Sequence, residues 1–192
     1  MLSHMGYPRL MSVDREDVLR SAAALLTRRA TATMDEVARA AGISRATLHR
    51  HFAGRDALIR ALEDLGLREF EAALDEARLG EGDALGALRR LVAAAEPSAG
   101  LIAFLVTENE LFEDGQNEGW NRLDARICAL FRRGQESGEF RIDLSTVWLT
   151  EAFYGLLGSA AWAVSSGRLA PKDFHFMLIE LLLGGVRRSV TS

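Results

Sequence analysis

Residues 45–50 bring together side chains that can hydrogen-bond to the edges of base pairs. Arg45, Thr47, His49 and Arg50 fall in the short stretch RATLHR. An arginine can donate two hydrogen bonds to one guanine, and a threonine can offer a hydroxyl to a base or a methyl group to thymine. Presented together on one face of a helix, these side chains would suit the major groove of duplex DNA.

Neighbouring residues have the chemistry to contact the DNA backbone. Thr33, His51 and Arg55 lie near expected helix starts, where free amide groups and positive charge favour a phosphate. Ser44 immediately precedes the basic stretch, and Ala46 lies within it. The candidate DNA-contacting residues are Thr33, Ser44, Arg45, Ala46, Thr47, His49, Arg50, His51 and Arg55.

Local signals predict the helices that would position these residues. Thr33 and Glu36 have the spacing of a capping box, in which each satisfies a free amide at a helix start. Gly42 allows the positive φ of a tight reversal, and Ser44 can cap the next helix. The predicted helices are 14–29, 34–41 and 45–52. Two short helices about a glycine turn, packed on a first helix, form a helix-turn-helix.

The third of these helices has one apolar and one polar face. A helix this short does not hold by itself in water, so Leu48 and Phe52 must be buried against the first two helices. Arg45, Thr47 and Arg50 would then remain on the outside. An alternative interpretation is a solvated basic face on an ordinary helical bundle.

Charge is distributed unevenly along the chain. The 192 residues carry a net charge of −4, yet residues 11–60 hold nine arginines against six acidic residues. Residues 61–192 are acidic, with thirteen basic and twenty-one acidic side chains. A basic front and an acidic body are typical of a protein that meets a polyanion at one end.

The remaining sequence also has helical periodicity. Further helices are predicted at 56–79, 83–95, 98–112, 119–137, 144–166 and 171–190. We therefore expect an all-α protein in which an N-terminal three-helix domain, residues 11–55, is continuous with a six-helix bundle, residues 56–192. Residues 1–10 show no periodicity and are interpreted as a disordered, tag-like segment.

Other classes of protein have little support in the sequence. It contains no HExxH motif, no Ser-centred elbow and no GxGxxG after a strand, so we expect no enzyme, cofactor or metal site. The single Cys128 excludes an internal disulfide and is interpreted as a buried thiol. No uncharged apolar run is long enough for a membrane span, and no leader is evident, so we expect a cytoplasmic protein.

The stretch from Thr33 to Leu58, TMDEVARAAGISRATLHRHFAGRDAL, resembles the DNA-binding domain of the TetR (tetracycline-repressor-like) transcriptional regulators. The shared features are the Thr before the second helix, the Ala-Gly-Ile-Ser turn and the Thr-Leu-x-x-His-Phe pattern. The resemblance covers about residues 14–62. His49 stands where the family usually has tyrosine, and Gly54 and Arg55 replace the usual Ser-Lys.

The resemblance implies a homodimer formed by the last two helices, and the residues there agree with it. Both helices are apolar on all sides and carry small residues that let backbones approach, so two copies could bury them in a four-helix contact. The alternative is that these side chains form the core of one protomer. The candidate interface residues are Trp148, Phe153, Leu156, Leu157, Trp162, Phe174, Leu178 and Leu182.

The resemblance further implies a ligand pocket among the preceding helices. An apolar, aromatic group of residues there could line a cavity or simply pack together, and Glu108 could meet a cationic ligand or face solvent. The candidate residues are Leu101, Phe104, Leu105, Glu108, Phe112, Trp120, Leu123, Ile127 and Phe131.

We therefore expect a repressor that binds a palindromic operator in double-stranded DNA and leaves it when an unidentified small molecule binds. In this hypothesis the ligand pushes the helix at 56–79 and changes the spacing of the two recognition helices. An activator, a ligand-independent repressor, and a helical interaction module without DNA binding remain as alternatives.

Overall fold

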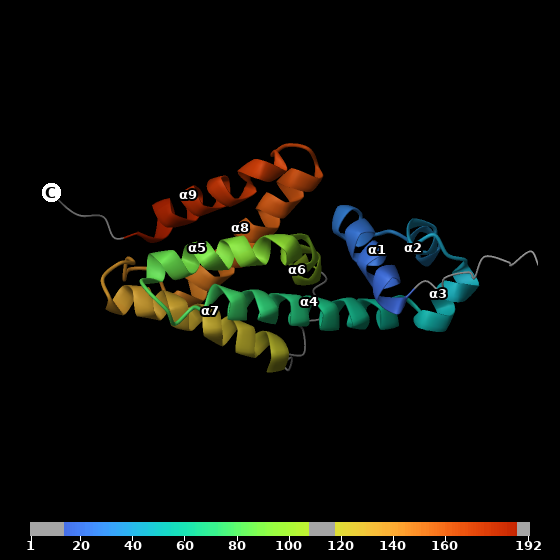
Figure 1. Ribbon diagram of the computed structural model, residues 1–192, viewed down its shortest axis with the longest axis horizontal. Coiled ribbons are helices and arrows are strands. Elements are labelled where there is room, and N and C mark those ends of the chain that lie inside the picture. Colours follow the sequence, from blue (N-terminus) through green and yellow to red (C-terminus); the bar gives the residue numbers. More distant parts are fainter. Residues whose placement is uncertain (1–13, 108–117, 188–192) are drawn as a thin grey trace, which may run out of the picture.

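The computed structural model describes residues 14–107 and 118–187, which fold into helices (Figure 1). In chain order these are α1 (Arg15–Arg28), α2 (Met34–Ala40), α3 (Arg45–His51), α4 (Arg55–Ala77), α5 (Ala84–Ala95), α6 (Ala99–Thr107), α7 (Glu118–Glu136), α8 (Thr146–Ser165) and α9 (Phe174–Val186). The predicted all-α class is confirmed for these residues. No helix in the described ranges has both the length and the apolar character needed to cross a membrane.

Two predicted helices begin differently, and proline explains both differences. A 3-10 turn, Glu96–Ser98, precedes α6, and another, Pro171–Asp173, precedes α9. Proline cannot donate a backbone hydrogen bond, so it is tolerated only in the first turn of a helix. The segment 1–10 and the predicted helix ends beyond Thr107 and Arg187 lie outside the described residues.

The front of the molecule consists of α1, α2 and α3, which gather at one end (Figure 1). Leu48 and Phe52 are almost fully buried, as the sequence predicts, among side chains that include Val18, Leu26 and Val37. The guanidinium of Arg15 lies 4.8 Å from the centre of the Phe52 ring, which adds a cation–π contact at the edge of this core.

A single long helix, α4, connects this end to the rear bundle and runs along it (Figure 1). One face of α4 is buried through Leu62, Leu65, Phe70 and Leu74. The front also contacts the rear directly, because the Thr27 hydroxyl of α1 donates a 3.1 Å hydrogen bond to the Gly100 carbonyl of α6. The ends of the molecule are therefore linked both through α4 and by direct contact of α1 with the rear bundle.

The segment after α7 forms hydrogen bonds and apolar contacts that stabilise the rear bundle. The Glu139 carboxylate accepts hydrogen bonds of 3.0 Å from the amides of Ala84 and Leu85 at the start of α5. Burial raises the pKa of Glu139, but these amide donors, the Ser137 hydroxyl and the Arg133 charge together outweigh burial and leave the pKa below its ordinary value. The next residue, Phe140, is fully buried and pairs with Phe131 at a ring separation of 5.9 Å.

Gly134 of α7 leaves the space that the Phe140 ring occupies. A Cβ atom at position 134 would lie 2.1 Å from Cδ2 of Phe140, a distance that the buried ring cannot tolerate without moving. We expect Gly134→Ala to lower the free energy of unfolding by about 2 kcal/mol, as overpacking does. Urea unfolding followed by circular dichroism measures the change.

Gly184→Ala serves as the control, because nothing lies within 4 Å of a Cβ atom built at that α9 position. Alanine there is expected to be neutral or stabilising by up to about 1 kcal/mol, since glycine is a poor helix former. Equal effects of the two variants would contradict the assigned role of Gly134.

Candidate nucleic-acid interface and adjoining cavities

The turn between α2 and α3 has the geometry that its sequence predicts. The Thr33 hydroxyl accepts from the Glu36 amide at 3.4 Å, while the Glu36 carboxylate accepts from the Thr33 amide at 2.8 Å. Gly42 has φ +68°, and the Ser44 hydroxyl accepts from the Thr47 amide at 3.1 Å. These contacts fix where α3 begins and which of its faces is presented to solvent.

The outer face of α3 carries the predicted base-reading side chains. Arg45 and Arg50 are exposed, and Thr47 is half-buried. Arg45 pairs with Asp35 of α2 at 3.2 Å, and Arg50 donates to the Thr47 hydroxyl at 2.9 Å. Because the Arg45–Asp35 pair is exposed, it contributes little stability and can exchange for a contact with DNA.

The other α3 candidates differ in exposure. Ala46 and His49 are exposed on the same helix, whereas His51 is half-buried with its ring 6.2 Å from that of Phe52. Asp35, the partner of Arg45, is absent from the sequence-based set of candidates. The signal that could have found it is its position in the first turn of α2, next to the turn that leads into α3.

Arg55 has a structural role that its local sequence did not predict. Its guanidinium donates to the carbonyls of Ala30 and Ala32 at 2.6 and 3.0 Å, so it ties the start of α4 to the loop between α1 and α2. These bonds use two of the five N–H donors of a guanidinium, and the phosphate contact of Arg55 stays a prediction. The interacting carbonyls lie more than twenty positions away, which no local pattern could reveal.

Arg55→Ala is expected to destabilise the front end by about 2 kcal/mol, because it removes two charge-assisted hydrogen bonds and leaves their carbonyls unsatisfied. Arg60→Ala is the matched control, since Arg60 is exposed on the next turn of α4. Thermal unfolding measures both. An unchanged melting temperature combined with weaker DNA binding would instead support a phosphate contact.

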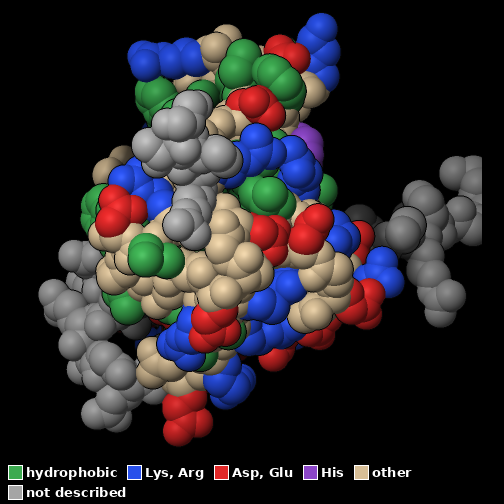
Figure 2. All heavy atoms as spheres, turned by 90° about the vertical axis from the view of Figure 1, so that its left-hand side faces the viewer, with side chains coloured by type: hydrophobic (Ala, Val, Ile, Leu, Met, Phe, Trp, Pro, Cys, Tyr) green, Lys and Arg blue, Asp and Glu red, His purple; other side chains and the backbone are tan. Residues whose placement is uncertain are grey.

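An apolar stripe is exposed on α8 and α9. The exposed large side chains of α8 are Val147, Trp148 and Trp162, and those of α9 are Phe176, Met177 and Leu181. Figure 2 shows hydrophobic side chains near its top, where α9 and the end of α8 lie in Figure 1, with charged side chains of both signs around them. We call these six residues the α8/α9 stripe.

The predicted interface set overlaps this stripe only in part. Trp148 and Trp162 are about half exposed, and Leu156 is half-buried. The other members are buried in the core of the protomer itself, so their selection as interface residues is corrected. These are Phe153, Leu157, Phe174, Leu178 and Leu182. Because both helices are apolar all round, the sequence did not indicate which side faces inward.

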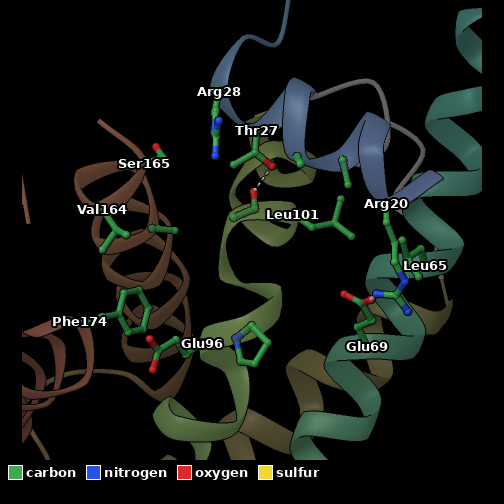
Figure 3. Close-up of a pocket in the computed structure, with 15 residues that line it drawn as sticks. Arg20, Thr27, Arg28, Leu65, Glu69, Glu96, Leu101, Val164, Ser165 and Phe174 are labelled. Atoms are coloured by element: carbon green, nitrogen blue, oxygen red, sulfur yellow. Dashed lines mark hydrogen bonds and ion pairs between the residues drawn. The ribbon is translucent and has the colours of Figure 1, made fainter. Parts of the chain in front are cut away.

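Two cavities flank α6 at the junction of the front and the rear. The smaller one, about 420 Å³, lies between α1, α4, α6, α8 and the start of α9. Figure 3 shows Val164, Ser165 and Phe174 on one side of it and Arg20, Leu65 and Glu69 on the other. The Arg20 guanidinium bonds the Glu69 and Glu16 carboxylates, each at 2.8 Å, so its charge is already paired.

The larger cavity, about 650 Å³, is bounded by the end of α1, by α6 and by α8; we call it the α1–α6–α8 cleft. Aromatic side chains of Phe104, Tyr154 and Trp162 line it. Arg168 also borders the cleft, with its guanidinium 4.6 Å from the Trp162 ring centre. A volume of this size falls in the range of small-molecule sites.

The predicted pocket residues divide between these cavities and the core. Leu101 lines the smaller cavity and Phe104 the α1–α6–α8 cleft. The others that the structure describes are buried and line neither of these two cavities, so their role in a ligand pocket stays a prediction: Leu105, Trp120, Leu123, Ile127 and Phe131. Glu108 and Phe112 lie outside the described residues.

Sequence reasoning missed most of the residues that line these cavities, among them Thr27 and Arg168. Thr27 lines both, although α1 belongs to the front end. Arg168 follows α8 in a loop whose glycine, Gly167, has φ +73°. The available signal was a lone arginine at a helix-terminating Ser-Ser-Gly sequence between two apolar helices.

Tyr154, which lines the cleft, belongs to a partly buried polar pair. The Tyr154 hydroxyl donates to the Asp124 carboxylate at 2.8 Å. Burial raises the pKa of Asp124 above its ordinary value, although the Tyr154 hydrogen bond acts in the opposite direction. Burial, followed by the Asp124 charge, raises the pKa of Tyr154 well above its ordinary range, so its hydroxyl stays protonated.

A helix-turn-helix with an exposed basic second helix, joined to a cavity-bearing helical bundle, defines a DNA-binding transcriptional regulator. Residues 18–62 match the family described as bacterial regulatory proteins, tetR family. Over 186 residues, the chain is 34% identical to the HTH-type transcriptional regulator NfxB of Pseudomonas aeruginosa, covering 95% of this chain and 99% of NfxB. The chain belongs to the tetR family.

Further relatives agree with this assignment. The HTH-type transcriptional repressor LfrR of Mycolicibacterium smegmatis is 26% identical over 155 residues, 80% of each chain. The structure of LfrR from Mycobacterium smegmatis in complex with proflavine superposes with a TM-score of 0.70 at 22% identity, covering 91% of this chain and 97% of that one. PfmR from Thermus thermophilus has a TM-score of 0.65 at 23% identity, covering 89% of this chain and 99% of that one. These two structures share the fold.

Proposed function

We propose that the protein is a homodimeric repressor that binds a palindromic operator and leaves it when a small molecule occupies its C-terminal part. The observation that carries the ligand response is that α1, a helix of the DNA-binding end, borders both cavities. A relative of the same fold, LfrR, was solved in complex with proflavine, which supports a small-molecule effector. We assign no catalytic activity.

The α8/α9 stripe supports the dimer. Trp148, Phe176 and Leu181 are each at least 60% exposed, and adjacent side chains of this size rarely face water in a protomer that functions alone. An isologous contact through this stripe would bury the exposed apolar side chains of both copies. It would also bring two α3 helices to one duplex. Two recognition helices one helical turn of DNA apart would read the two halves of a palindrome.

The proposed coupling follows the contacts of α1. A ligand in either cavity would touch the last turns of α1, which lead directly into the loop before α2. The Thr27–Gly100 hydrogen bond links the same turns to α6. This route adds to the transmission through α4 that we expected from the sequence. A ligand shifts the equilibrium only to the extent that it binds one arrangement more tightly.

In this proposal residues 11–55 form the DNA-binding domain, and residues 56–192 form the domain that binds ligand and dimerises. Helix α1 of the DNA-binding domain contributes to the cavities. A regulator must share a compartment with the chromosome, which supports the cytoplasm as its location.

Selection of bound duplexes from a random pool tests DNA binding and dimerism together. We expect a palindrome whose half-sites are about ten base pairs apart, or a multiple of that spacing. A single asymmetric site would contradict the dimer. Transcription in vitro from a promoter that contains the selected site then separates a repressor from an activator by the direction of the change.

A further inference from the structure

The α1–α6–α8 cleft combines an aromatic interior with one cationic residue at its border. Phe104, Tyr154 and Trp162 supply the rings, and Gly155 leaves open space on the α8 side, since nothing lies within 4 Å of a Cβ atom built there. Among the described residues that line this cleft, Arg168 alone is charged. The ring faces favour a flat apolar group, because aromatic rings stack well against one another.

The position of Arg168 favours an anion at the same site. Its guanidinium lies over Trp162, and no carboxylate of the described residues forms an ion pair with it. The Arg168 side chain is exposed, so an anionic group placed there would keep part of its hydration while it gains the arginine contact. Asp124 does not line the cleft, and its carboxylate accepts the hydrogen bond of the Tyr154 hydroxyl.

We infer that the α1–α6–α8 cleft binds a planar aromatic anion, a carboxylate or a sulfonate, with its rings among Phe104, Tyr154 and Trp162 and its charge on Arg168. This inference rests on the proposed ligand response and adds the chemical class of the ligand and the residue that selects it. The occupant would also contact Thr27 and Ala30 at the end of α1, which is the route to the DNA-binding end.

A pair of fluorescent probes that differ in charge tests the inference. The first is 1-anilinonaphthalene-8-sulfonate, an aromatic anion, and the second is N-phenyl-1-naphthylamine, which lacks the sulfonate. Titration of the full chain with each is followed by fluorescence. We expect Arg168→Gln to weaken binding of the sulfonate about tenfold and to change binding of the neutral probe less than about twofold.

Two further variants locate the site. Arg89→Gln removes an exposed arginine from α5, which borders neither cavity, and is expected to leave both probes unaffected. Gly155→Leu places a side chain in the cleft, where nothing lies within 4 Å of the added Cβ atom, and is expected to abolish binding of both. Circular dichroism and sedimentation check that each variant is folded and has the parent's oligomeric state.

The inference is overturned if Arg168→Gln leaves sulfonate binding unchanged, or if it weakens both probes equally. It is also overturned if the neutral probe binds the parent protein as tightly as the sulfonate does. Release of the selected DNA duplex is measured separately. If the sulfonate binds through Arg168 and the DNA complex is unaffected, the cleft assignment stands and the ligand-release proposal fails. If the sulfonate does not bind through Arg168 while another compound releases DNA equally from the parent and Arg168→Gln, the cleft assignment fails and ligand release stands.

Discussion

Arg45→Ala is expected to lose most of the preference for the operator over unrelated DNA. Arg45 is the first residue of α3, and the Ser44 cap and the Gly42 turn fix its position. A bidentate arginine–guanine contact discriminates by about 1–3 kcal/mol, and a dimer makes the contact twice. We expect specific affinity to fall about a hundredfold, while affinity for random duplex falls much less.

Fluorescence anisotropy with the selected operator and with a scrambled duplex measures this preference. Arg39→Ala is the matched control, because Arg39 is exposed on α2 and its guanidinium is directed to the Asp35 carbonyl at 3.4 Å. It removes the same charge from the same end of the molecule, so it isolates base reading from general attraction to phosphate. An unchanged ratio of operator to scrambled affinity in Arg45→Ala would refute the assignment of Arg45.

The front end could be predicted from the sequence because its determinants are local. The Thr33–Glu36 capping box, the Gly42 reversal and the Ser44 cap each involve residues at most three positions apart. The burial of Leu48 and Phe52 followed from their spacing on one helical face. In each case the residues that cause the local structure lie within one short stretch of sequence.

The other features of the structure depend on contacts between residues that are far apart in the sequence, which no local pattern encodes. Arg55 binds carbonyls that belong to the loop after α1, and Thr27 meets α6 across more than seventy positions. The apolar faces of α8 and α9 are nearly uniform, so only packing distinguishes buried Phe153 from exposed Trp148. The cavities arise where α1 meets α6 and α8, a junction that helical periodicity alone cannot place.

The second large effect is expected from Leu181→Glu, which should dissociate the dimer. Leu181 is 63% exposed and is the last of the three α9 residues in the α8/α9 stripe. Its substitution leaves the core of the protomer intact, since its side chain faces solvent there. In the dimer, each copy would have to bury an unpaired carboxylate, which costs several kcal/mol. We expect the dissociation constant of the dimer to rise at least about a hundredfold.

Sedimentation equilibrium measures the dimer, and anisotropy with the full palindrome measures the consequence for DNA. A monomer holds one half-site only, so operator affinity should fall with the dimer while the front end stays folded. Ile142→Glu is the control, because Ile142 is 78% exposed yet lies outside both α8 and α9. If Leu181→Glu remained dimeric and Ile142→Glu dissociated, the contact between copies would lie on the loop between α7 and α8. The two α3 helices would then be held apart by a different surface, and the half-site spacing expected from the α8/α9 stripe would no longer follow.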